Sequence, residues 1–66
     1  MKRRDVVALL LAHGAVLLRE GGSHTIYVCT CGKKHKAPVP RHRETTAGVV
    51  QSITKSMTCF PEGWLQ

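Results

Sequence analysis

The chain has 66 residues, a formal net charge of +6 and 42% hydrophobic residues. Its length allows one domain, expected over residues 1–66, because a chain of about 60 residues buries only roughly 60% of its unfolded surface. The longest apolar run, residues 6–12, is far shorter than the roughly 20 residues that span a membrane, and we expect no signal peptide. The positive charge favours an anionic partner such as nucleic acid.

The first twenty residues predict a helix and a strand. Residues 2–13 carry apolar side chains at helical spacing, and Gly14 follows as a stop signal. Three cations at residues 2–4 oppose the dipole of this helix. This placement hints that they contact something outside the chain, and solubility alone is the alternative explanation. Residues 15–20 read as a short strand that ends at the glycine pair 21–22.

A hairpin is predicted in the middle of the chain. Residues 25–30 alternate between two faces, as a strand does, and residues 31–34 resemble a turn. Residues 36–40 form the returning strand. Because Pro38 and Pro40 cannot donate ladder hydrogen bonds, this strand should lie at a sheet edge.

A second helix is predicted over residues 45–58, before Pro61. Phe60, Trp64 and Leu65 are expected to fold back onto the core. The predicted order is helix, three strands, helix. We therefore predict an α+β fold in which a three-stranded antiparallel sheet carries both helices on one face.

The motif Gly22-Ser23-His24 is the most informative stretch of the sequence. Glycines at 21 and 22 allow positive φ angles and a close approach of the backbone to a partner. A histidine that follows such a turn can face solvent and exchange a proton near neutral pH. His24 is therefore the candidate catalytic residue, and an ordinary polar turn residue is the alternative.

Three segments, taken together, resemble the HicA-type toxins, which are small mRNA interferases of toxin–antitoxin pairs. Residues 19–27 (REGGSHTIY) resemble the active-site segment of that family. Residues 39–42 (VPRH) are similar to its Val-Pro-x-His segment, and residues 48–55 are similar to its Gly-x-x-x-x-Ile-x-Lys stretch. The resemblance spans nearly the whole chain in the same order.

The resemblance implies a fold similar to a double-stranded-RNA-binding domain. It also implies a metal-independent endoribonuclease that cleaves mRNA in the cytoplasm and is inhibited by a HicB-type antitoxin. Gly22 and Ser23 would shape the turn, and His24 would be the catalytic histidine. No membrane and no small-molecule cofactor are expected. A non-catalytic double-stranded-RNA-binding module is the alternative function.

Basic residues are candidates for binding RNA phosphates. Arg19 lies close to the glycine turn in the sequence, and further cations crowd the predicted hairpin and its exit. Such a cluster can neutralise phosphates. The alternative is that these charges are solvated and only prevent the edge of the hairpin from pairing with another sheet. The cluster consists of Lys33, Lys34, Lys36, Arg41 and Arg43.

The three cysteines form an odd set, which is atypical of a secreted disulfide scaffold. A reducing cytoplasm is the simpler expectation. Cys29, Cys31 and His35 suggest a zinc site, but a fourth ligand is not evident because Cys59 lies across a helix in the sequence. We therefore expect no metal and no other cofactor, with the cysteines as ordinary strand residues.

Other polar and aromatic residues have more than one interpretation. His42 is either a second proton-transfer group or a structural residue. His13 is expected to cap or pack against the first helix, and His35 is expected to be solvated. Tyr27 either stacks on an unpaired base or packs in the core.

Overall fold

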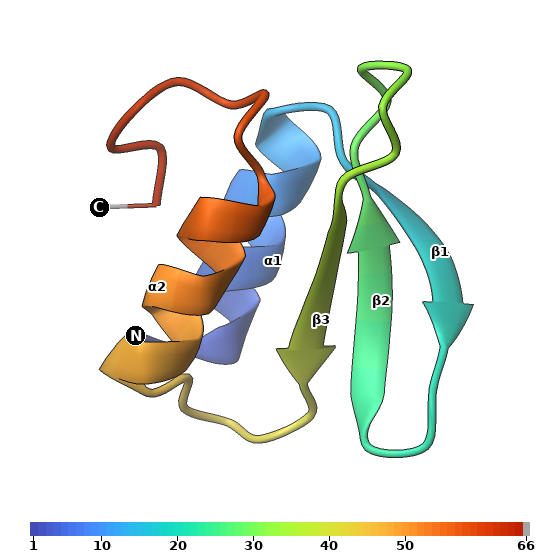
Figure 1. Cartoon of the computed structure of the whole chain (residues 1–66). Helices are drawn as coiled ribbons and strands as arrows, with labels where there is room; N and C mark the ends of the chain where they lie inside the picture. The colour runs from blue at the N-terminus through green and yellow to red at the C-terminus, as the bar shows by residue number, and fades with distance from the viewer. Residues whose placement is uncertain (66) are drawn as a thin grey trace.

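The computed structural model describes residues 1–65. Its elements follow the order α1 (Arg3–Ala12), β1 (Val16–Glu20), β2 (His24–Val28), β3 (Lys36–Pro40) and α2 (Ala47–Ser56) (Figure 1). Each predicted element is present, and its ends differ from the prediction by at most two residues. The α+β fold of helix, antiparallel sheet and helix is confirmed.

The sheet is a simple meander with the order β1-β2-β3. Strand β2 pairs antiparallel with both neighbours, and His24 lies opposite Pro40 at one end of the β2–β3 ladder. The two prolines of β3 lie on an edge strand, as predicted, because an edge strand does not need every N–H group. The β1–β2 ladder shifts register between Leu17 and Arg19, where the strand bulges.

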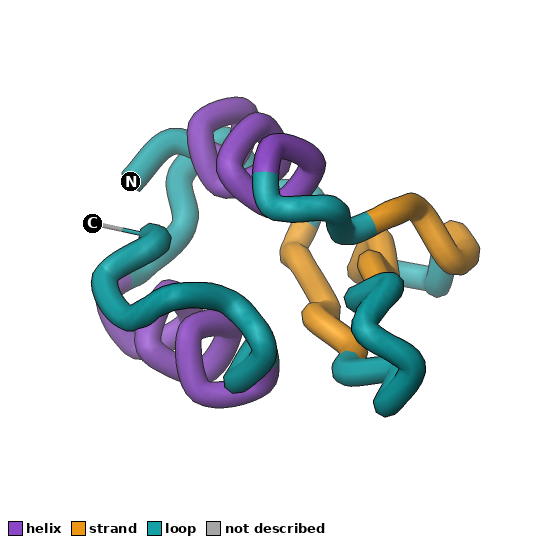
Figure 2. The backbone as a smooth tube through the Cα atoms, turned by 90° about the horizontal axis from the view of Figure 1, so that it is seen from above, coloured by secondary structure: helices purple, strands orange, loops and turns teal. Residues whose placement is uncertain are grey.

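One face of the sheet supports the core. Both helices lie to one side of the strands and contact β3 (Figure 2). Burial alternates along β2 and β3, as the pleat of a strand requires, so that Tyr27, Ala37 and Val39 face the helices. Val6 and Leu10 of α1 and Ile53 of α2 are fully or almost fully buried against them.

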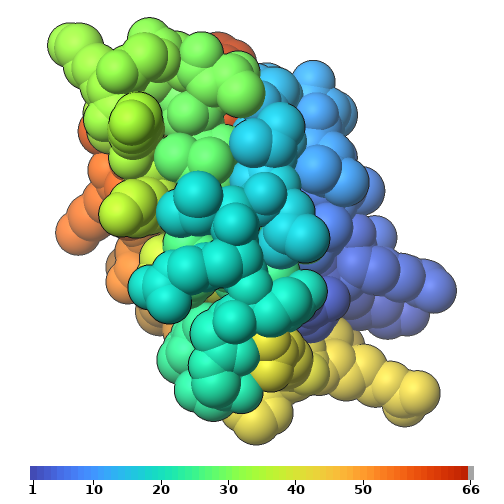
Figure 3. All heavy atoms as spheres, turned by 90° about the vertical axis from the view of Figure 1, so that its right-hand side faces the viewer, coloured from blue at the N-terminus to red at the C-terminus, as the bar shows by residue number. Residues whose placement is uncertain are grey.

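Strand β1 lies outside this core. All five of its residues are exposed, including Val16, Leu17 and Leu18, whose exposed fractions are 46%, 53% and 44%. Figure 3 looks onto this side of the molecule, and the side chains of β1 lie at its front. The apolar side chains of β1 therefore form a free surface that leads into the β1–β2 turn.

The segment after α2 folds back onto the core, as predicted. Trp64 and Leu65 are buried, and Phe60 packs against the same cluster. The ring of His13 lies 5.4 Å from Phe60 and 5.7 Å from Trp64, and its Nδ1 contacts the Leu9 carbonyl at 2.9 Å. His13 is thus a packing residue. Within residues 1–65, neither helix has the length and apolar character needed to cross a membrane.

Candidate active site

The β1–β2 turn is closed by its own backbone. The Gly21 N–H donates to the His24 carbonyl at 2.7 Å, and a Cβ on Gly21 would lie only 3.0 Å from that oxygen. Gly21 and Gly22 do not use the positive φ angles that glycine allows, because among the described glycines only 14, 32 and 63 adopt them. Gly21 is needed instead for the close approach, whereas a Cβ on Gly22 would meet no atom.

Arg41, the residue that follows β3, fixes this turn. Its guanidinium donates to the Gly22 carbonyl at 2.8 Å, to the Gly21 carbonyl at 2.6 Å and to Glu20 Oε1 at 2.7 Å. A planar guanidinium suits such a set of acceptors because its donors have a fixed geometry. Arg41, predicted to bind substrate, therefore holds the loop that carries the candidate histidine.

Glu20 is the common acceptor of a wider network. Thr25, which is 2% exposed, donates to Glu20 Oε1 at 2.9 Å, and Arg3 donates to the Thr25 hydroxyl at 3.0 Å. The hydrogen bond from Arg41, followed by that from Thr25, lowers the pKa of the Glu20 carboxyl. Because the folded-state pKa is lowered, the network stabilises the turn above the ordinary carboxyl pKa of 4.5 and loses this effect as the pH falls through the folded value.

His24 is the first residue of β2 and is exposed. Its neighbour Thr25 is buried toward the helices, so the alternation of the strand directs His24 to the open face. The Ser23 hydroxyl lies 3.0 Å from His24 Nδ1. When Nδ1–H donates to Ser23 Oγ, the neutral ring keeps an unprotonated Nε2, which is then available to a substrate.

The predicted phosphate-binding residues divide into two groups. Arg41 and Arg43 follow β3 at the end where His24 pairs with Pro40, whereas Lys36 pairs with Val28 at the opposite end. Four residue steps of a strand separate these ends by about 13 Å. Lys33 and Lys34 extend the group at the Lys36 end. The basic residues that were expected to form one cluster therefore form two. Arg19 is exposed on β1, opposite Ile26.

A basic hollow lies beside the His24 end of the sheet. It has a volume of about 590 Å³, and it is lined by Lys2, Arg3, Arg4, Arg43 and Glu44. Arg3 links it to the network described above, since its Nε donates to the Pro40 carbonyl at 3.0 Å. The sequence hinted at an external use of Lys2, Arg3 and Arg4 but did not place them among the candidate site residues. The available signal was a run of three cations at the unfavourable end of a helix.

Two further residues are placed by the structure. Tyr27 is 7% exposed and belongs to the core, which favours the packing interpretation over base stacking. His42 is exposed in the loop between β3 and α2. It therefore remains available to solvent on the segment that begins with Arg41.

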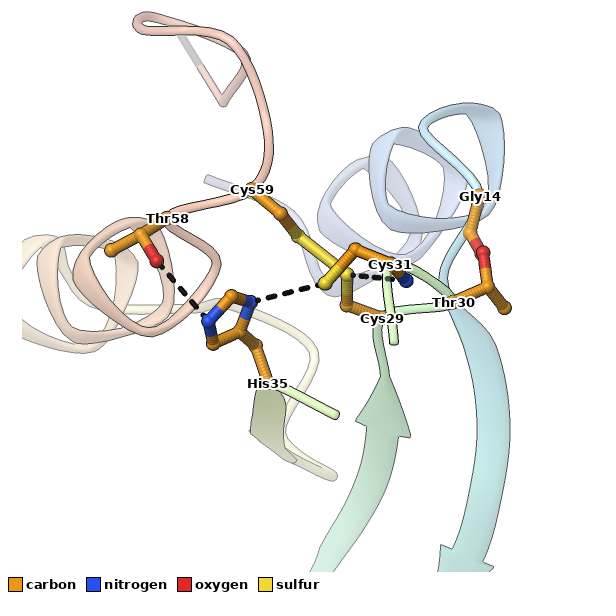
Figure 4. The surroundings of a disulfide bond; sticks show 7 residues. All are labelled: Gly14, Cys29, Thr30, Cys31, His35, Thr58 and Cys59. Carbon is orange, nitrogen blue, oxygen red and sulfur yellow. Dashed lines mark hydrogen bonds between the residues drawn. A yellow bond between two sulfur atoms is a disulfide. The ribbon is translucent and has the colours of Figure 1, made fainter. Parts of the chain in front are cut away.

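The cysteines gather at the other end of β2. Cys29 and Cys59 form a disulfide, and Cys31 Sγ lies 3.5 Å from His35 Nδ1 (Figure 4). The expectations that Cys59 lies apart and that His35 is solvated are wrong. The chain after α2 turns back toward the β2–β3 loop, which brings Cys59 to Cys29, and His35 is half-buried between Cys31 and Thr58.

Comparison with known proteins identifies the family of the chain. A family model described as the HicA toxin of bacterial toxin–antitoxin systems matches residues 3–57. The searches of curated proteins and of solved structures gave no match. The match runs from the start of α1 to the residue after α2, and it includes the β1–β2 turn and His24. Because the match covers most of the chain, this protein belongs to the HicA toxin family.

Proposed function

We propose that this protein is an endoribonuclease that cleaves mRNA in the cytoplasm with His24 as its catalytic residue. The observation that carries the proposal is an exposed histidine on a turn that is held rigidly by hydrogen bonds. Ser23 contacts one ring nitrogen, and Arg41 fixes the loop through three acceptors. Membership of a toxin family supports an activity that harms the cell.

The proposed reaction uses the nucleophile that RNA itself carries. Nε2 of His24 takes the proton of a ribose 2′-hydroxyl, whose oxygen attacks the adjacent phosphate. The bond to the 5′ oxygen of the next nucleotide then breaks, and that oxygen takes a proton from water while the protonated His24 ring returns its proton to the solvent. The products are a 2′,3′-cyclic phosphate and a 5′-hydroxyl. The reaction needs no metal ion, and general acid–base catalysis of this kind contributes about 10²–10⁴-fold.

The surrounding residues are assigned complementary roles. Gly22 and Ser23 place the ring, and the cations Arg19 and Arg43 bind phosphates of the RNA. Lys33, Lys34 and Lys36 provide a second phosphate-binding surface at the far end of the sheet. A HicB-type antitoxin is the proposed inhibitor, because the exposed turn is open to a covering protein.

The experiment compares purified wild type with His24→Ala on a defined single-stranded RNA in buffer containing EDTA. We expect a loss of about 10²–10⁴-fold in cleavage rate, because the variant lacks the proton acceptor. Circular dichroism should show an unchanged fold, since the exposed side chain packs against no core residue. Equal cleavage by the two proteins would disprove the assignment.

His42→Ala is the matched control, because it removes another exposed histidine and does not change any residue of the β1–β2 turn. We expect it to retain cleavage, which would show that the loss in His24→Ala does not follow from removing any exposed histidine. Loss of cleavage in both variants would instead assign His42 as a second proton-transfer group.

A non-catalytic RNA-binding module is the second candidate, favoured by the two basic surfaces. It predicts RNA binding by the wild type without any turnover. The appearance of 2′,3′-cyclic phosphate ends in EDTA, with the fold intact, would exclude it.

A further inference from the structure

Four metal-ligating side chains converge beyond the end of β2 that lies opposite His24. They are Cys29, Cys31, His35 and Cys59, and their ligand atoms all lie within 4.8 Å of one another (Figure 4). Three of them come from the β2–β3 loop, and Cys59 comes from the segment after α2. We propose that in the reduced protein these residues bind one structural Zn²⁺ ion. This site would replace the expectation that the chain holds no metal.

The donor set and its spacing suit zinc. Structural zinc sites use four ligands in a tetrahedron, and three cysteines with one histidine are a common set. Zn–S and Zn–N bonds of about 2.3 and 2.0–2.1 Å place S and N about 3.5 Å apart in a tetrahedron. Cys31 Sγ and His35 Nδ1 are separated by 3.5 Å. Two vertices of the tetrahedron are therefore already in place.

The backbone positions of Cys29 and Cys59 also favour a metal between them. Their Cα atoms lie 7.6 Å apart, whereas disulfides usually hold them about 4.4–6.8 Å apart. Two thiolates on one Zn²⁺ keep their sulfurs about 3.8 Å apart, given the Zn–S bond length. Zinc binding would therefore hold the two sulfurs further apart than a disulfide does, which fits the long distance between the two Cα atoms.

Hydrogen bonds around the cluster match those that orient zinc ligands. His35 Nε2 lies 3.3 Å from the Thr58 hydroxyl, so an Nε2–H donated there leaves Nδ1 free to bind the metal. The Cys31 N–H donates to Cys29 Sγ at 3.2 Å, which stabilises a thiolate at that position. Both contacts are made by residues within or next to the ligand set.

The loop that supplies three ligands is closed and curled. The Cys29 N–H donates to the His35 carbonyl at 2.8 Å. Between them, Gly32 and Lys34 adopt positive φ angles of 92° and 55°, and the second is costly for a residue with a side chain. Zn²⁺ with three thiolates and one neutral imidazole carries a single negative charge, which the exposed Lys33 and Lys34 complement.

Zinc binding requires that the disulfide be reduced. A thiol reductant supplies two electrons and two protons, which gives two cysteine thiols and one oxidised reductant disulfide. Zn²⁺ then replaces the three thiol protons of Cys29, Cys31 and Cys59, which are released to water. A domain of this size commonly needs such a link, here between the β2–β3 loop and the segment after α2.

The test uses the whole chain, purified in 2-mercaptoethanol under argon. The zinc content of the purified protein is measured by elemental mass spectrometry. We expect about one Zn²⁺ per chain, and we expect Co²⁺ exchanged into the site to show the intense visible absorption of a tetrahedral thiolate complex. Cys31→Ser and His35→Ala should lose the metal, and Thr58→Val should bind it about 10-fold more weakly. His42→Ala is the control and should keep one Zn²⁺.

Cys31→Ser separates the proposal from a disulfide alone, because it retains both disulfide partners. If zinc binds, this variant should melt below the wild type under reducing conditions with Zn²⁺. The proposal is overturned if the reduced, folded wild type takes up neither Zn²⁺ nor Co²⁺. It is also overturned if Cys31→Ser binds Co²⁺ as the wild type does.

Discussion

At the scale of single residues, Arg41 would act on the proposed reaction by holding the turn that carries His24. Its guanidinium is bound to Glu20, Gly21 and Gly22, so few of its donors remain for a phosphate. The side chain instead sets the position of the next two residues, Ser23 and His24. A displacement of about 1 Å in a reacting group costs about 10²-fold in rate.

We therefore expect Arg41→Ala to lower kcat by about 10²-fold while KM changes little. Arg41→Lys should restore only part of the rate, because an ammonium lacks the fixed fork of donors with which the guanidinium contacts its three acceptors. Single-turnover and steady-state cleavage of a short RNA would measure both constants. The matched variant is Arg43→Ala, which removes a cation from the basic hollow and should raise KM instead. A rise in KM alone for Arg41→Ala would identify it as a phosphate ligand.

At the scale of the elements, strand β2 separates two candidate sites. His24 begins the strand, and the cluster that contains Cys29 follows its end. The lysines of the β2–β3 loop lie at the end of β2 that is followed by Cys29. Their charge serves the proposed RNA surface, and it also lies beside the proposed zinc ligands.

Replacing Lys33, Lys34 and Lys36 by Ala should weaken RNA binding for all sequences. Each phosphate contact with a single strand contributes about 0.7 to the slope of log K against log salt, so three lost contacts flatten it by about 2. Fluorescence anisotropy at several salt concentrations measures this slope. The rate of cleavage at saturating RNA should stay unchanged, because these residues lie far from His24. An unchanged slope would place the RNA surface at the basic hollow alone.

At the scale of the whole molecule, the exposed features of residues 1–65 include the apolar side chains of β1, the β1–β2 turn and the basic hollow. The proposed ribonuclease would harm its own cell unless it is inhibited, and we propose that the antitoxin inhibits it by covering the turn. An acidic partner would associate rapidly with so basic a chain through electrostatic steering. Val16, Leu17 and Leu18 lead directly into this turn and offer apolar area to the same partner.

Expression of the chain alone should arrest growth, and co-expression of the neighbouring open reading frame should restore it. The two proteins should copurify, and hydrogen exchange should slow in β1 and in the turn rather than around Cys31. His24→Ala is the control, because it should be harmless alone and should still copurify. A well-expressed, folded wild type that neither arrests growth nor binds the neighbour would favour the RNA-binding module.

The sequence by itself determined the elements and their order. Helical and alternating spacing of apolar residues, with glycine and proline at the boundaries, depends on local geometry. Residues 36–40 were therefore predicted with their observed bounds. The Gly22-Ser23-His24 motif was visible for the same reason, since the turn and the histidine are neighbours in the chain.

The tertiary structure alone decided which distant residues meet. Arg41 reaches Glu20 because β2 brings the end of β3 beside the end of β1, and no local pattern reports that pairing. Cys59 meets Cys29 because the segment after α2 turns back over the core to bury Trp64 and Leu65. The hydrophobic effect depends on how much apolar area is buried and not on direction, so no local sequence pattern shows which distant residues will pack together. The fourth candidate ligand, Cys59, therefore became evident only in the three-dimensional structure.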